Sequence, residues 1–97
     1  MTRSIHRFAA DDLVEAARRY KVEAGAGLAR RFLDEFERIA KLLEEFPDIG
    51  MPTGEGRQSF PLVGFPYTLI YRCDDGGIRI LVVRHQSRDP EYGESRR

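Results

Sequence analysis

The side chains best suited to chemistry gather in residues 80–92, ILVVRHQSRDPEY. Four apolar residues, typical of a buried strand, are followed within a few positions by Arg84, His85, Arg88 and Tyr92. Cleavage of RNA needs a base for the 2′-hydroxyl, an acid for the leaving oxygen and cations for the phosphate. These roles can be filled by His85, Arg88 and Tyr92, together with Arg72 from a neighbouring predicted strand.

Two other interpretations use the same residues without catalysis. In one, arginines at the end of the sheet bind another macromolecule, because guanidinium groups suit planar recognition of carboxylates and phosphates; the binding set is then Arg57, Arg72, Arg84 and Arg88. In the other, His85 hydrogen-bonds locally and the arginines pair with nearby acids, namely Asp74, Asp75, Asp89 and Glu91. Spacing alone leaves all three open.

Metal and cofactor chemistry has little support in the sequence. Cys73 is the single cysteine, so no zinc cluster of cysteines and histidines can form around it. The GEG at residues 54–56 lacks the lysine and the strand-to-helix setting of a phosphate-binding loop. Adjacent acids at a helix start, Asp11 and Asp12, are usually caps, and His6 falls on a predicted strand with a structural role. We therefore predict no metal site and no cofactor.

Composition limits the classes of partner and location. The 97 residues form one predicted domain, with 16 basic and 16 acidic side chains and zero formal net charge. This balance argues against a strong general affinity for nucleic acid. Fourteen of the cations are arginine. A single cysteine, no signal-like N-terminus and no apolar window of about 20 residues predict a cytoplasmic protein that does not enter a membrane.

Periodicity predicts the elements that position these side chains. Residues 3–8 alternate weakly as a strand, and 11–24 and 28–46 have helical spacing, with Phe46 on the apolar face of the second helix. The glycine- and proline-rich residues 47–56 are predicted to be a loop. Two-fold alternation then predicts strands at 57–63 and 67–73, followed by a turn at 74–77. A nearly continuous apolar run predicts the last strand at 78–85. Residues 88–97 are expected to be a partly frayed tail.

This order predicts an α+β fold, a two-layer sandwich in which a helical hairpin packs on a mainly antiparallel four-stranded sheet, β-α-α-β-β-β. Pro61 favours an edge position for strand 57–63. The apolar strand 78–85 is expected to be central. The sequence leaves the position of the first strand open, and a place beside strand 78–85 is the preferred choice. Strict alternation places Leu81 and Val83 on the face of His85, and Ile80 and Val82 on that of Arg84.

Four segments together resemble the RelE/ParE toxin superfamily of type II toxin–antitoxin modules. They are DLVEAARRY, FLDEFERIAKLLEEFPDIGMP, FPYTLIYR and ILVVRHQSRDPEY, in this order within residues 8–92. The resemblance implies the same fold and a bacterial toxin neutralised by a cognate antitoxin. RelE-like members cut mRNA on the ribosome, whereas ParE-like members inhibit DNA gyrase.

Particular residues favour the ParE-like branch. Nuclease members have cations in the loop after the second helix, where this chain has none, and an arginine where it has Thr68. The His-Gln-Ser at 85–87 is similar to a ParE-type ending.

The preferred hypothesis is thus a gyrase-binding toxin that contacts its target through Arg57, Arg72, Arg84 and Arg88. The alternatives are a ribosome-dependent mRNA endonuclease with His85, Arg72, Arg88 and Tyr92, and a non-toxic member that still binds antitoxin. The strand edge near Phe60 could receive the antitoxin or mediate a homodimer.

Overall fold

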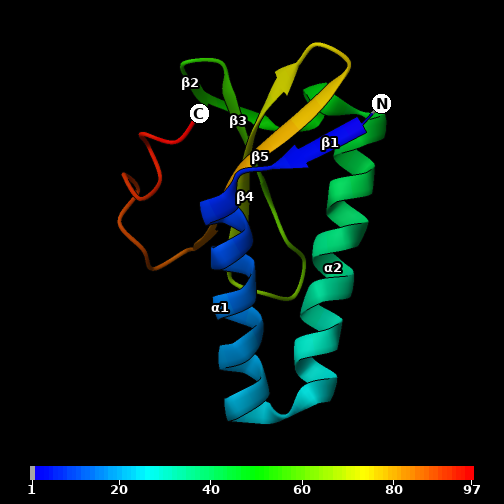
Figure 1. Cartoon of the computed structure of the whole chain (residues 1–97), viewed down its shortest axis with the longest axis vertical. Coiled ribbons are helices and arrows are strands. Elements are labelled where there is room, and N and C mark those ends of the chain that lie inside the picture. The colour runs from blue at the N-terminus through cyan, green and yellow to red at the C-terminus, as the bar shows by residue number, and fades with distance from the viewer. Residues whose placement is uncertain (1) are drawn as a thin grey trace.

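The computed structural model describes residues 2–97, in which a helical hairpin covers one face of a sheet (Figure 1). The elements are β1 (Thr2–Ile5), α1 (Arg7–Ala24), α2 (Ala26–Glu45), a 3-10 turn η1 (Pro47–Ile49), β2 (Met51–Gly54), β3 (Arg57–Pro61), β4 (Tyr67–Asp74) and β5 (Gly77–His85). This confirms the predicted α+β class and layer order.

The sheet has five strands rather than the predicted four, in the order β1-β5-β4-β3-β2. The additional strand, β2, comes from the predicted loop. Positive φ angles at Gly54, Glu55 and Gly56 turn the chain so that residues 51–54 pair antiparallel with β3. Because β2 pairs with Arg57–Ser59, only Phe60 and Pro61 of β3 keep the edge character that was predicted for the whole strand.

The first strand lies beside the last, which settles a position that the sequence left open, and it pairs parallel with β5. Gly77 makes this pairing possible, because a Cβ atom there would lie 2.2 Å from the carbonyl oxygen of Thr2. The strand is shorter than predicted. His6 is the N-cap of α1, and its ring Nδ1 accepts a hydrogen bond from the backbone N–H of Phe8 at 3.1 Å. The helix therefore starts at Arg7, four residues earlier than expected.

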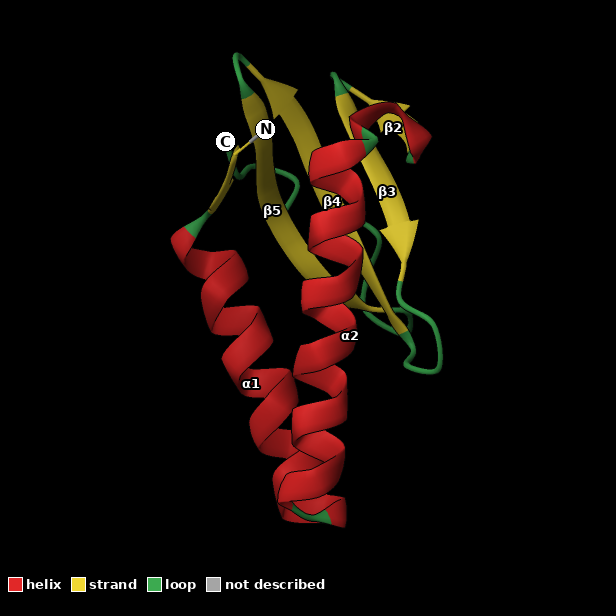
Figure 2. Ribbon diagram, turned by 90° about the vertical axis from the view of Figure 1, so that its right-hand side faces the viewer, coloured by secondary structure: helices red, strands yellow, loops and turns green. Residues whose placement is uncertain are grey.

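The two helices are separated by Gly25 alone, which has a φ of +97° and ends one helix as it begins the next. α2 thus begins at Ala26 instead of Leu28. Figure 2 shows both helices on one side of the sheet, with their linked ends extending past the strands. Phe46 is 53% exposed, contrary to prediction, because the chain leaves the helix at that residue.

The main core lies between the helices and one face of the sheet. Its fully buried side chains include Phe32, Ile39 and Leu43 from α2, and Leu69 and Tyr71 from β4. Beside them, the rings of Tyr20, Phe32, Phe65 and Tyr67 pack with centroids 5.2–6.2 Å apart. Such offset and edge-on arrangements add to the stability gained from burial.

A β-bulge in β5 changes which side chains share a face. Ile70 pairs with Val82 whereas Tyr71 pairs with Ile80, so Leu81 is an extra residue in β5. Ile80 therefore packs in the main core, on the side of Val83, and not on the side of Arg84 as strict alternation predicted. Val82 and Leu81 pack with Ile70 in a second, smaller cluster on the other face, which we call the outer face.

Candidate functional site

The end of β5 places His85 opposite Tyr67 of β4, on the helix side of the sheet. The two rings meet edge to face, with centroids 5.0 Å apart. The imidazole Nδ1 accepts a hydrogen bond from the backbone N–H of Ser87 at 3.0 Å and lies 2.8 Å from its hydroxyl. The predicted local hydrogen bonding of His85 is thus present, and it leaves Nε2 as the nitrogen that can face a ligand.

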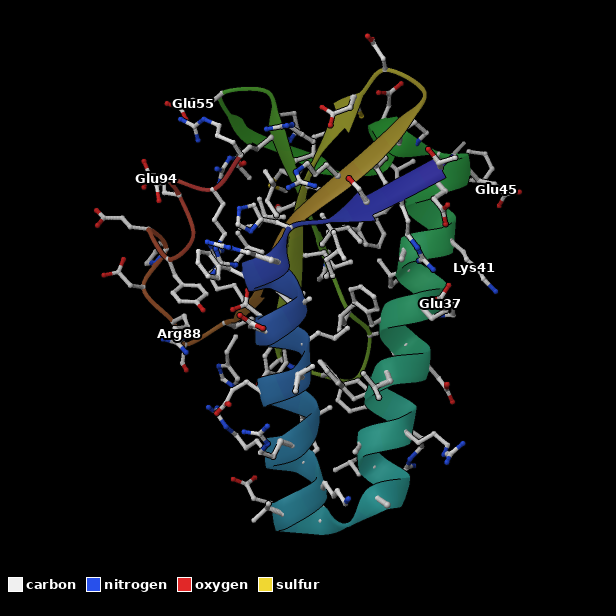
Figure 3. The ribbon with its side chains drawn as sticks, in the orientation of Figure 1. Glu37, Lys41, Glu45, Glu55, Arg88 and Glu94 are labelled. Atoms are coloured by element: carbon white, nitrogen blue, oxygen red, sulfur yellow. The ribbon has the colours of Figure 1, made fainter. Side chains whose placement is uncertain are left out.

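His85 lies in a cleft of about 210 Å³ between α1 and the end of the sheet. Arg88 and Tyr92 from the tail also line it, and the guanidinium carbon of Arg88 sits 4.3 Å from the Tyr92 ring centroid. Figure 3 shows Arg88 pointing away from the ribbon. Burial raises the pKa of Tyr67 in the same cleft. The remaining lining residues are Asp11, Asp12, Glu15, Ala16, Arg19 and Val83.

The tail folds back over the outer face instead of fraying. The Tyr92 hydroxyl donates to one carboxylate oxygen of Asp12, and Arg96 donates to the other at 2.6 Å. Arg96 also donates to the carbonyl of Leu81 at 3.0 Å, at the bulge. Asp12, from α1, therefore connects the helix, the bulge and the tail.

Arg57 anchors the same segment from β3. It is 9% exposed and donates to the carbonyl oxygens of Gly93, Glu94 and Arg96. Burial lowers the pKa of this guanidinium, and the positive charge of Arg97 lowers it further. Arg57 is thus an internal support for the tail and not part of an exposed binding surface.

The predicted catalytic set is only partly brought together. His85, Arg88 and Tyr92 line one cleft, but Arg72 is five positions along β4 from Tyr67, the partner of His85. At roughly 3.3 Å per residue this is about 17 Å. Arg72 also lies on the opposite face, where it pairs with Asp74 at 2.9 Å. One phosphate cannot contact both Arg72 and His85 in this arrangement.

The predicted binding arginines do not form one exposed row either. Arg84 lies on the outer face, where one guanidinium nitrogen donates to the carbonyl of Pro90 at 3.0 Å. It lines a cleft of about 350 Å³ between the tail and the β2–β3 turn, together with Arg57 and Tyr92. Glu55 and Glu94, on the same side of the molecule in Figure 3, also line this cleft. Of the four predicted binding arginines, Arg84 and Arg88 lie near the end of β5.

The roles of Asp12 and Arg96 are not apparent from the sequence, because Asp12 has the position of a helix cap and the tail is polar enough to predict a frayed end. One signal was present: β4 and β5 carry apolar residues on both faces, whereas the helices cover only one. Ile70 and Val82 need a second cover, and the tail is the segment that provides it.

Two structural findings bear on cofactors and membranes. Within residues 2–97, no three His, Cys, Asp or Glu side chains converge as metal ligands would. Neither α1 nor α2 is apolar enough over its length to cross a membrane.

Comparison with known proteins identifies the family. Residues 4–90 match the family model of the ParE toxin of the type II toxin–antitoxin system parDE. A solved structure, described as the chromosomal ParDE TA system from P. aeruginosa, has the same fold, with a TM-score of 0.78 and 24% identity over 88% of this chain and 95% of that chain. A search of curated proteins found no significant match. The chain belongs to the ParE toxin family of type II toxin–antitoxin systems.

Proposed function

We propose that this ParE toxin inhibits DNA gyrase by binding it, without catalysis, and that a cognate antitoxin neutralises it in the cytoplasm. The separation of Arg72 from His85 is the observation that favours gyrase over mRNA as the target. An RNA-cleaving site needs its cations and its acid–base groups around one phosphate. Here they lie on opposite faces, about 17 Å apart along the strand.

The groups that do share a cleft are poorly placed for RNA cleavage. The Tyr92 hydroxyl already donates its proton to Asp12, so it is not free to protonate a leaving oxygen. Residues 47–56, after α2, contain no cation to hold a phosphate. Of the predicted catalytic residues, His85 alone is then left to transfer a proton, where the reaction needs two such groups.

Arg84 and Arg88 are the side chains best placed to contact the target. They flank His85 on two sides of the strand end, and the Arg88 side chain extends into solvent. Arg84 uses one guanidinium nitrogen for Pro90 and keeps its other donors for a carboxylate or phosphate. Arg72 extends this surface along the outer face, although part of its charge is balanced by Asp74.

An apolar groove is the proposed docking place for the antitoxin. It has a volume of about 470 Å³ between β1 and the helices and is lined by Ile5, Leu13, Val14 and Phe36. Val14 is 56% exposed, and Arg3 and Glu37, which form an ion pair with each other, also line the groove. A disordered antitoxin segment that folds on binding would cover these apolar side chains.

The gyrase assignment can be tested with purified toxin. We expect inhibition of gyrase supercoiling, or accumulation of gyrase-cleaved DNA, while transcripts stay intact in a ribosome-containing translation reaction. Ribosome-dependent transcript cleavage that His85→Ala abolishes would assign the toxin to the nuclease class instead. A folded, antitoxin-free protein that affects neither reaction nor growth would indicate a non-toxic member.

Two matched variants, a test and a control, examine the proposed antitoxin groove. Val14→Gln should weaken antitoxin binding about tenfold or more, since burial of a valine side chain contributes about 1.5 kcal/mol or more. Val22→Gln is the control, because Val22 is 80% exposed on the same helix but outside the groove. Equal effects of the two variants, measured by titration with the antitoxin, would place the antitoxin elsewhere.

A further inference from the structure

The linked ends of α1 and α2 carry a concentrated positive charge. Residues 16–33 contain five cations and one acid, Glu23; the cations are Arg18, Arg19, Lys21, Arg30 and Arg31. We call these residues the hairpin tip. The following residues have the opposite balance, with six acids and two cations in 34–48. The zero net charge of the chain thus conceals a strongly bipolar helical hairpin.

The tip charges are free to meet a partner. All five cations are exposed, and their helix ends extend past the sheet in both views of the molecule (Figures 1 and 2). Within residues 2–97, the single ion pair at the tip joins Arg18 to Glu15 at 3.8 Å, and both side chains are mostly exposed. Such surface pairs are weak and exchange readily with other partners.

The chemistry of the tip fits nucleic acid better than protein. Specific protein interfaces are built around buried aromatic anchors, but Tyr20 and Phe32 turn inward to the core. The rest of the tip surface is mainly cationic, with Val22 and Leu33 as its large exposed apolar side chains. Residues 24–27, where the two helices meet, are only alanine and glycine. Interfaces with DNA are polar and strongly positive, and small residues let the backbone come close to phosphates.

We propose that the hairpin tip binds the phosphate backbone of duplex DNA without sequence preference. Duplex DNA carries one charge per about 1.7 Å of its axis, so it attracts such a tip more strongly than a sparsely charged surface does. Cations on two adjacent helices, with axes about 8–10 Å apart, can contact several phosphates at once. Arg19 also lines the cleft of Arg88, but Arg30 and Arg31 line neither that cleft nor the one of Arg84. DNA binding through Arg30 and Arg31 therefore does not depend on the proposed contact with gyrase.

The test is fluorescence polarisation of a labelled duplex of mixed sequence titrated with purified toxin, at several salt concentrations and without gyrase. Arg30→Gln/Arg31→Gln removes two tip cations. The control, Arg38→Gln/Lys41→Gln, removes two cations from the acidic half of the same helix and changes the net charge equally. Circular dichroism verifies that both variants are folded.

We expect the wild type to bind with an affinity that falls steeply as salt rises. The tip variant should bind at least tenfold more weakly at 50 mM salt, with a log–log salt slope shallower by about 1.8, because each phosphate contact contributes about 0.9. The control should stay within twofold of the wild type. Equal losses in the two variants, no DNA binding at low salt, or a tip variant that binds DNA normally but loses antitoxin affinity would each overturn the proposal.

Discussion

The guanidinium of Arg96 in the tail donates two hydrogen bonds to the carboxylate of Asp12 in α1, at 2.6 and 3.4 Å. The side chains are only 10% and 7% exposed, so this ion pair is largely shielded from water. Burial acts against the charge on Arg96, but the bonds to Asp12 and Tyr92 outweigh it and raise its pKa. The pair attaches the C-terminal segment to the helical layer across the end of the sheet.

Asp12→Asn should destabilise the protein by about 3–5 kcal/mol, because it leaves the Arg96 charge buried without its counter-ion. The NH2 group of the new asparagine would also face an N–H donor of Arg96 or of Val83, and two donors cannot hydrogen-bond to each other. Urea denaturation measures the loss. Asp11→Asn, at the exposed neighbouring position, should change stability by less than about 0.5 kcal/mol. In the double variant Asp12→Asn/Arg96→Met, much of the loss should be recovered; a loss below about 1 kcal/mol for Asp12→Asn would show that the pair contributes little.

Gly93→Ala should loosen the tail from the outer face. Gly93 has a φ of +78°, and a Cβ atom there would lie 2.6 Å from Cγ2 of Val82. Gly76→Ala is the control, because its φ is +79° but no atom lies within 4 Å of its added Cβ. Both should cost about 1–2 kcal/mol from backbone strain, and Gly93→Ala about 1–3 kcal/mol more from the clash. Thermal unfolding of the two variants compares them, and equal losses would mean that the tail moves away without cost.

Tyr71→Phe should cost about 1–3 kcal/mol, because it leaves a buried backbone donor without a partner. The Tyr71 hydroxyl accepts from the N–H of Gly50 at 3.0 Å and donates to the carbonyl of Pro47 at 2.7 Å. The loss should appear in chemical denaturation as a lower midpoint. Tyr67→Phe, in the same strand, removes a hydroxyl that has no hydrogen-bond partner within residues 2–97 and should be nearly neutral. A neutral Tyr71→Phe would show that water replaces the hydroxyl.

Stability should fall on acidification through the titration of His6. Its pKa is lowered, first by burial and then by the charges of Arg79, Arg96 and Arg7. A histidine that charges less readily when folded binds its proton mainly in the unfolded state, so stability is lost as pH falls through about 6.5. His6→Asn keeps an N-cap acceptor and should flatten the stability profile between pH 7.5 and 5.5. Identical profiles in the two proteins would exclude His6 as the source.

Arg84→Gln/Arg88→Gln should reduce gyrase inhibition at least tenfold, because two charged contacts of about 1 kcal/mol or more each are lost. His85→Gln should leave inhibition within about threefold of the wild type, since gyrase binding requires no proton transfer. The supercoiling assay compares the three proteins at matched concentrations. If His85→Gln inactivates the toxin while the arginine variant stays active, inhibition depends on His85 and not on the two arginines.

The sequence by itself determined the layers of the fold and the approximate place of each helix and of all but one strand. The apolar face of residues 28–46 requires a partner surface, and the alternation in 67–73 together with the apolar run in 78–85 supplies one. These signals are local and repeat with the period of the backbone, so they can be read without coordinates. They also brought His85, Arg88 and Tyr92 to one strand end, but they left the position of the first strand in the sheet open, which the tertiary structure decided.

Only the tertiary structure decided how the arginines are used. Arg57 is internal because tail carbonyls some 36 residues away surround it, and Ile80 leaves the face of Arg84 because one extra residue, Leu81, enters β5. Asp12 and Arg96 are 84 positions apart, and no local pattern connects them. Contacts of this kind depend on where distant segments meet after packing, and the division of the arginines between internal supports and exposed ligands follows from those contacts alone.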